Sequence, residues 1–433
     1  MKNLPLIALG KTISKTSKIL NRGNGSTWPG HIALKGNPNF IRNILSNSPT
    51  KVIIVVGTNG KTTTSGLIKT GLEKNGKTVF QNISGANLLN GVASTILLNT
   101  NAQGKLTQDF AIFEVDENAL PQVLNQFTPD YLVLLNLFRD QLDRYGEIHT
   151  IADKWKNAIG KLSDKTKLIV NADDPQIAFL GLSAKYKNQS AYFSLQAKIA
   201  SSKQQAADSV SCPHCGKKLI FESYTFSHLG KWLCKSCGLK QPVPVLSSFP
   251  YYPLSGEYNK YNVIAAALVL KEIGLVEDQI QTSFESFLPA FGRQEIIEFQ
   301  GKKVQLFLSK NPTSFNQSFD TIRELRASTL LIVLNDRIPD GRDISWIWDV
   351  ELPELNTFKQ IIVSGDRVYD MALRMKYELG IKNYEKKVSI FKELKEAINY
   401  GIGALSEKET LYILPNYSAM LDSRKILTGK KIL

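Results

Sequence analysis

The first 72 residues of this 433-residue chain contain no aspartate or glutamate, and the first acidic residue is Glu73. Lysine and arginine are spread through the same segment, and the whole chain carries a formal net charge of +14. A segment with this bias attracts phosphates, anionic lipid or nucleic acid. The charge alone does not choose among these partners.

Long hydrophobic runs are also missing. No apolar stretch approaches the roughly 20 residues that a membrane-spanning helix needs. The N-terminus does not fit a secretory signal, because the apolar stretch Leu4–Leu9 is short and lysines follow it. We therefore expect a cytoplasmic protein. Its length predicts two or three domains.

Cysteine is scarce, and all four cysteines fall in one segment, Cys212-x₂-Cys215-x₁₈-Cys234-x₂-Cys237. This double knuckle predicts a structural Cys₄ zinc ribbon, since four thiolates fill a tetrahedral site and leave no open position. Two disulfides are the alternative, which an intracellular location disfavours. The neighbouring histidines, His214 and His228, are possible competing ligands, although the double knuckle needs neither.

Because zinc would engage every cysteine, no thiol remains to act as a nucleophile. Enzymes that take ammonia from glutamine usually release it with a Cys-His pair. If this chain uses glutamine as a nitrogen source, a partner subunit must therefore release the ammonia.

A phosphate-binding loop is the clearest motif present. The β-branched run Lys51–Val56 predicts a strand, Thr63–Glu73 predicts a helix, and GTNGKTT lies between them. This loop is shorter than the common G-x-x-x-x-G-K-[ST] pattern. Its backbone N–H groups would cradle phosphates of ATP, the lysine would neutralise the β- and γ-phosphates, and the hydroxyl after it would bind Mg²⁺. The predicted nucleotide-binding residues are Gly57, Thr58, Asn59, Gly60, Lys61, Thr62 and Thr63.

Alternation of apolar strands and helical stretches predicts an α/β fold with mostly parallel sheets. We divide the chain into a basic N-terminal segment (1–45), an ATP-binding domain (46–295) with the ribbon inserted at about 205–242, and a C-terminal α/β domain (296–433). Further strands are predicted at Phe110–Val115, Tyr131–Leu137, Lys167–Val170, Lys303–Leu308, Thr329–Leu334, Gln360–Val363 and Thr410–Leu414, and a helix at Asn259–Ile273.

The start of the chain predicts an amphipathic helix. Leu6, Leu9, Ile13 and Leu20 recur at helical spacing, and lysines share another face. One interpretation is a helix that touches an anionic membrane surface transiently. The other is an ordinary surface helix packed on the body of the protein.

The glycine loop after a hydrophobic strand resembles the Mur ligase family of ATP-dependent amide-forming enzymes. Further landmarks follow in family order: Glu114 after a strand, then NLFRDQLD, NADDP, GEYNKYN and GRQE at 136–143, 171–175, 256–262 and 292–295. The resemblance implies a Mur-ligase-type ATPase domain followed by a Rossmann-like α/β domain. The cysteine segment and the C-terminal half resemble the branch of the family that amidates lipid II.

The resemblance also implies residue roles. Glu114 would bind Mg²⁺ beside Thr62, and Arg293 would reach the phosphates. Asn259 and Asn262 would contact the adenine side, and Asp174 would lie near the ribose. One departure is Gln141, which stands where the family has a histidine that helps to hold a second metal ion. A second Mg²⁺ would therefore lack its usual ligand.

The segment 334–350 reads LNDRIPDGRDISWIWDV and is dense in charges beside tryptophan. A solvated loop is one interpretation, and an interface is the other. In the resembling branch, an aspartate of this motif completes the Cys-His pair of a GatD-like glutaminase subunit. That residue here is Asp349. Asn335, Asp336 and Asp343 are weaker candidates for an acceptor site or ammonia path.

The function implied is ATP-dependent amidation of the D-glutamate α-carboxylate of lipid II to D-isoglutamine, through an acyl phosphate. The expected partners are the glutaminase and lipid II at the inner face of the membrane, and no nucleic acid. Two alternatives remain open: a ligase that adds an amino acid, as in folylpolyglutamate synthase, and a zinc-ribbon NTPase that acts on nucleic acid.

Overall fold

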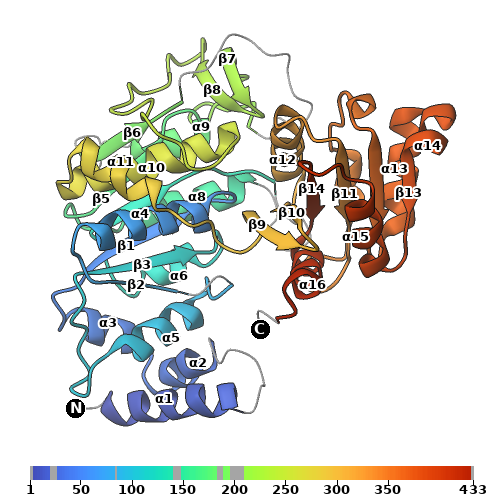
Figure 1. Ribbon diagram of the computed structural model, residues 1–433. Coiled ribbons are helices and arrows are strands. Elements are labelled where there is room, and N and C mark those ends of the chain that lie inside the picture. The colour runs from blue at the N-terminus through green and yellow to red at the C-terminus, as the bar shows by residue number, and fades with distance from the viewer. Residues whose placement is uncertain are drawn as a thin grey trace.

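The computed structural model describes residues 3–19, 27–82, 85–139, 148–182, 189–195 and 209–430. Figure 1 shows two α/β domains side by side, with a small two-stranded unit, β7 and β8, at the top beside α12. The predicted fold class is confirmed.

The first domain is built on six strands that are all parallel, in the order β2-β3-β1-β4-β5-β6. The strands are β1 (Lys51–Val56), β2 (Val79–Gln81), β3 (Phe110–Val115), β4 (Tyr131–Leu134), β5 (Lys167–Asn171) and β6 (Ser190–Phe193). The predicted bounds of β1 and β3 are confirmed to the residue, whereas β2 and β6 were not predicted.

Both faces of this sheet are buried, as expected for parallel strands. Along β1, Val52, Ile54 and Val56 join the hydrophobic core on one face, and Ile53 and Val55 join the core on the other. The first core includes α1 (Leu4–Ile19), α2 (Trp28–Gly36), α3 (Phe40–Leu45), α5 (Leu89–Asn99), α6 (Leu120–Leu124), α8 (Ile148–Ile159) and α9 (Pro175–Gly181). The second includes α4 (Lys61–Lys74), α10 (Glu257–Ile273) and α11 (Glu277–Glu285).

The helix predicted at the start of the chain is present as α1. Ile7 is 4% exposed and belongs to the core, and Lys11 Nζ donates a hydrogen bond to the Thr100 carbonyl at 2.5 Å. Leu4 and Leu9 point outward, with 38% and 49% of their surface exposed. The basic segment is therefore part of the first domain. Among the described residues, no helix is long and apolar enough to cross a membrane.

The second domain has the strand order β13-β12-β11-β14-β10-β9, in which only β9 is antiparallel to its neighbour. The strands are β9 (Arg293–Phe299), β10 (Lys302–Phe307), β11 (Thr329–Val333), β12 (Gln360–Ser364), β13 (Val388–Ile390) and β14 (Thr410–Pro415). The helices are α12 (Pro312–Glu324), α13 (Val368–Leu379), α14 (Ile381–Lys387), α15 (Leu394–Gly403) and α16 (Tyr417–Thr428), with short 3₁₀ turns η1 (Ser345–Trp348) and η2 (Leu355–Thr357). The second sheet thus begins three residues before the boundary set from the sequence.

The cysteine segment forms a hairpin of β7 (Ile220–Phe226) and β8 (Leu229–Leu233) with a knuckle on either side of it in the chain. Trp232 is 1% exposed and packs with Cys212, Cys234 and Ala178 of α9. The insertion is therefore seated on the first domain through α9 and the end of β5.

Candidate active site

The glycine loop lies against the segment that follows β4. A side chain at Gly57, whose φ is +147°, would come within 2.9 Å of the Asn136 backbone nitrogen. Thr58 N–H donates to the Asn136 carbonyl at 3.0 Å, and Asn59 N–H donates to Asn136 Oδ1 at 2.9 Å. Thr58 Oγ1 accepts from the Phe138 N–H at 3.0 Å. These contacts fix the path of the loop at the start of α4.

Lys61 opens α4, and its ammonium group is largely buried. It donates to the Gly57 carbonyl at 2.5 Å and forms an ion pair with Glu117 Oε2 at 3.3 Å. The ammonium thus lies across the loop, where phosphate oxygens of a nucleotide would compete with Glu117 for it. Glu117 was not predicted as a site residue.

Thr62 and Glu114 were predicted to share a magnesium ion, and the structure brings them together. Thr62 Oγ1 donates to Glu114 Oε2 at 2.8 Å. Glu114 is 5% exposed, and its Oε1 is buried without a hydrogen-bond partner among the described residues. Burial raises the pKa of Glu114. The hydrogen bond from Thr62 and the positive charges of Lys61 and Arg293 act in the opposite direction but do not cancel this effect. A free buried carboxylate oxygen beside a hydroxyl suits a hard divalent cation.

The C-terminal domain contributes to the same place. Arg293, the first residue of β9, has its pKa lowered by burial, and the charge of Glu114 opposes this effect. The next residue, Gln294, has a left-handed backbone with φ of +62°. Its side chain donates to the Ser255 carbonyl at 2.8 Å and to Tyr258 Oη at 2.9 Å.

A pocket lies between the two domains. Its polar and charged lining includes residues of the glycine loop and of β9, and its apolar lining includes Phe138, Phe226 and Leu229. Its lining includes Asn59, Gly60, Thr63, Asn136, Phe138, Phe226, Leu229, Tyr258, Asn259, Tyr261, Asn262, Gly292, Arg293, Gln294, Phe307, Leu308, Thr313, Ser314, Gln317 and Ser318. A lining that combines polar and charged groups with aromatic and apolar side chains suits a nucleotide, which carries charged phosphates and a flat base.

Half of the predicted nucleotide-binding residues line this pocket, namely Asn59, Gly60, Thr63, Asn259 and Asn262, and Asp174 is not among them. Asn259 and Asn262 line the pocket and are linked by a hydrogen bond of 3.1 Å. Asp174 is fully buried outside the lining, where it caps α9 and accepts from the Leu137 N–H at 2.8 Å. The contacts of its carboxylate are therefore with the protein itself. Gln141 lies outside the described residues.

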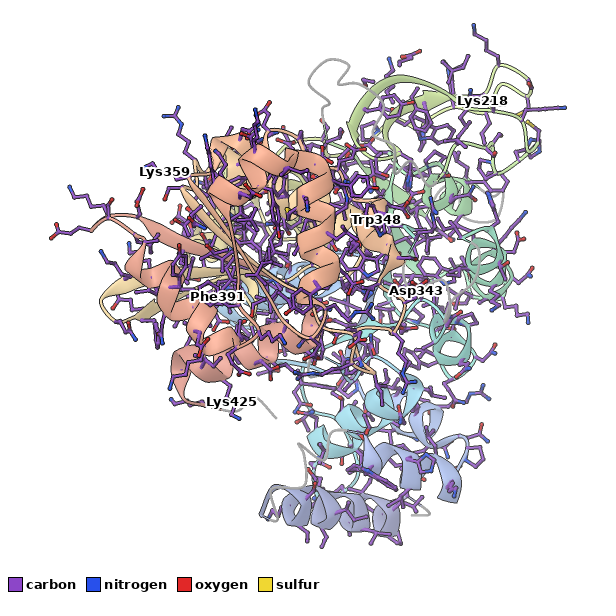
Figure 2. All side chains as sticks on the ribbon, turned by 90° about the vertical axis from the view of Figure 1, so that its right-hand side faces the viewer. Lys218, Asp343, Trp348, Lys359, Phe391 and Lys425 are labelled. Atoms are coloured by element: carbon purple, nitrogen blue, oxygen red, sulfur yellow. The ribbon has the colours of Figure 1, made fainter. Side chains whose placement is uncertain are left out.

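Asp349 lies elsewhere, on the surface of the C-terminal domain directly after η1. Next to it, Trp348 is 49% exposed and meets Tyr377 edge-on with ring centroids 5.6 Å apart. Asp343 and Trp348, both labelled in Figure 2, belong to the same segment between β11 and β12. Asn335 and Asp336, by contrast, follow β11, where Asn335 is 2% exposed.

The four cysteines come together as predicted. Their Sγ atoms all lie within 4.8 Å of one another, with Cys212 and Cys237 at 3.6 Å and Cys215 and Cys234 at 3.5 Å. Sulfur atoms bound to one zinc at about 2.3 Å in a tetrahedron lie about 3.8 Å apart, so the cluster is compatible with zinc. His228 is not in the cluster, because it faces Asp174.

Comparison with known proteins agrees with this geometry. A family model described as "Mur ligase middle domain" matches residues 55–270, and one described as "MurT ligase C-terminal" matches residues 308–420. The Staphylococcus aureus (strain COL) protein "Lipid II isoglutaminyl synthase (glutamine-hydrolyzing) subunit MurT" is 31% identical over 97% of this chain and 96% of its own length. The chain belongs to the MurT family of Mur ligases. The Streptococcus pneumoniae protein of the same name is 30% identical over 96% of this chain and 95% of its own.

Solved structures share the fold of this MurT-family chain. A pseudomurein peptide ligase type C from Methanothermus fervidus has a TM-score of 0.65 at 22% identity, over 90% of this chain and 81% of that protein. Folylpolyglutamate synthase from Mycobacterium tuberculosis has a TM-score of 0.57 at 15% identity, over 91% and 95%. At these identities the likeness concerns the fold alone.

Sequence reasoning missed several residues of the pocket. Asn136 and Tyr258 stand inside motifs that carried the family resemblance, so their positions held a usable signal. Glu117 lies two residues after a buried strand, and this position was a weaker signal of a site residue. Phe226 and Leu229 belong to the ribbon, and nothing in the sequence connected the ribbon to the nucleotide pocket.

Proposed function

We propose that this chain is the ATP-dependent synthetase that amidates the D-glutamate α-carboxylate of the lipid II stem peptide to D-isoglutamine. The observation that carries the proposal is a glycine loop where Lys61 and Glu114 lie beside a pocket lined by Arg293, in a chain that aligns nearly end to end with MurT subunits. The setting would be the inner face of the membrane, where the basic N-terminal helices could meet anionic lipid.

The reaction would proceed in two steps. A carboxylate oxygen attacks the γ-phosphorus of ATP, the bond to the bridging oxygen breaks, and ADP leaves. Ammonia then attacks the acyl carbon, phosphate departs with the former carboxylate oxygen, and the amide loses one proton from nitrogen. Lys61 and Arg293 would stabilise charge on the transferred phosphoryl group.

Thr62 and Glu114 would hold Mg²⁺, which neutralises phosphate charge when bound. The fit rests on the free Oε1 atom of Glu114 and the hydroxyl 2.8 Å from its Oε2. The pKa of this carboxyl is raised by burial, and a bound cation would reverse that effect by favouring the ionised form.

Ammonia would come from a GatD-like glutaminase partner. All four cysteines of the chain are in the ribbon, so no thiol is left for hydrolysis of glutamine. We assign Asp349 to this partner: its exposed position beside Trp348 leaves the carboxylate accessible to a histidine of another subunit.

Zinc would be structural in the ribbon, and this has a direct test. Cys212→Ser should lower the zinc content of the purified protein, measured by elemental analysis, and lower its melting temperature, because metal binding contributes folding free energy. Ser211→Ala, one residue away and outside the cluster, is the matched control. An unchanged zinc content in the Cys212 variant would contradict the metal site.

The proposed activity is tested by incubating lipid II with the purified chain, Mg-ATP and ammonium at mildly alkaline pH. Mass spectrometry should show one hydroxyl of the stem peptide replaced by an amine, only when ATP is present. ATP turnover without this change would contradict the proposed acceptor, and an amino-acid acceptor would then be tested next.

A further inference from the structure

The β7–β8 hairpin has two functional ends. At one end its strands lead into the cysteine knuckles, with Trp232 and Cys234 buried in one small core. At the other end Phe226 and Leu229, the residues on either side of the turn, line the pocket that contains Asn59 and Gly60 of the glycine loop. One short hairpin therefore connects the metal site to the nucleotide pocket.

The turn is held against the first domain by buried polar contacts. His228 is fully buried, with Nε2 3.3 Å from Asp174 Oδ2 and its ring 4.9 Å from that of Phe138. Tyr261 Oη donates to Thr225 Oγ1 at 3.1 Å. Asp174 thus positions the turn and α9 together, which accounts for its burial away from the pocket.

Further back, Trp232 Nε1 donates to the Ala172 carbonyl at 3.0 Å, at the end of β5. The hairpin is therefore anchored at its middle as well as at its turn. The cysteine cluster lies at the far end of the hairpin, where Figure 2 places Lys218 at the outer edge of the molecule.

The glycine loop contributes Asn59, Gly60 and Thr63 to the pocket lining, and the hairpin contributes Phe226 and Leu229. The Phe138 and Phe226 rings are 6.0 Å apart with planes inclined by 23°, and both are nearly buried. In the proposed site the phosphates of a nucleotide lie at the glycine loop, so its base extends away from the loop. The aromatic and apolar part of the lining that the base would meet comes from Phe138 and the hairpin turn.

We propose that Phe226 and Leu229 hold the purine base of ATP, and that the cysteine cluster positions them by fixing the far end of the hairpin. This inference rests on the proposed nucleotide site and adds a function for the ribbon within it. Phe226 is a binding residue here, and the cysteines are positioning residues.

The experiment compares two ligands by isothermal titration calorimetry, Mg-ATP and magnesium triphosphate, which lacks a base. Phe226→Leu keeps an apolar side chain and removes the aromatic face, so the Kd for ATP should rise about tenfold. The Kd for triphosphate should stay unchanged, because the glycine loop is untouched. Phe221→Leu is the matched control, since Phe221 lies on the same hairpin, stacks on Tyr224 at 4.7 Å and is outside the pocket.

Zinc content and melting temperature of each variant are measured first, so that a folding defect is recognised. Cys212→Ser should also raise the Kd for ATP and leave the Kd for triphosphate unchanged. If Phe226→Leu raises the Kd of both ligands equally, or leaves the Kd for ATP unchanged, Phe226 does not hold the base. If the unmodified chain binds neither ligand, the nucleotide site itself is wrong, and the inference falls with it.

Discussion

Replacing Lys61 with alanine should lower ATP-dependent amidation about 10³-fold, as expected when a positioned cation is removed from a developing phosphoryl charge. The ammonium group lies across the glycine loop, 2.5 Å from the Gly57 carbonyl. The other lysines of α4 lie two or more turns further along the helix. The measurement is the steady-state rate of ADP release with lipid II and ammonium present. Retained turnover would show that the phosphates bind elsewhere.

The control for this variant is Lys69→Ala, because Lys69 lies on the same helix. Its side chain is 35% exposed and forms an ion pair of 3.8 Å with Glu73, one turn further along the helix. Turnover of this variant should equal that of the unmodified chain. Since the Lys61 variant leaves the buried Glu117 carboxylate without its cation, a melting curve of each protein separates lost stability from lost chemistry.

Asp349→Asn should separate the two nitrogen sources. In complex with a GatD-like subunit, glutamine-driven amidation should fall by about 10³-fold or more, because an amide cannot hold the partner's histidine in the required tautomer. Ammonia-driven amidation should not change, since Asp349 lies on the surface after η1 and outside the nucleotide pocket. Both rates are measured on one preparation by mass spectrometry of lipid II.

Glu354→Gln is the control for Asp349, because it removes a carboxylate from the same exposed segment. Glu354 is 65% exposed at its side chain and pairs only with Arg323 among the described ion pairs, at 3.4 Å. Both nitrogen sources should work normally in this variant. Equal loss of both activities in the Asp349 variant would place that residue in the synthetase site instead.

Buried central strands were predictable because their side chains are apolar on both faces. The runs at β1 and β3 could be bounded to the residue, and the strands β10, β11, β12 and β14 to within one. The strands that were missed lie at or near the edges of the sheets. β2 and β13 have three residues each, which is too short for a clear pattern. The sequence of β9, RQEIIEF, mixes charged and apolar residues, and this pattern does not indicate which strand pairs with it.

The site was predictable where one motif specifies one local geometry. A glycine loop between a strand and a helix defines its own contacts, so Lys61 and Thr62 could be assigned from the sequence. Residues brought in from other elements could not. Glu117 reaches Lys61 only through the fold, and Phe226 reaches the pocket only because the ribbon is seated on α9 and β5.

Asp174 shows that a motif residue can also have a structural role that the sequence did not predict. The NADDP segment suggested a ligand contact, but the proline after Asp174 starts α9, and a carboxylate at that position satisfies the first free N–H groups of the helix. The same carboxylate then accepts from Leu137 and faces His228. In the structure, the contacts of this carboxylate cap α9 and hold the hairpin turn.

The left-handed backbone at Gln294 links the position of the domains to the conformation of one residue. Such a conformation costs on the order of 1 kcal/mol for a residue other than glycine. It is offset while the Gln294 side chain is bonded to Ser255 and Tyr258 of the other domain. These bonds join the two domains, so the conformation of this one residue is coupled to the contact between them.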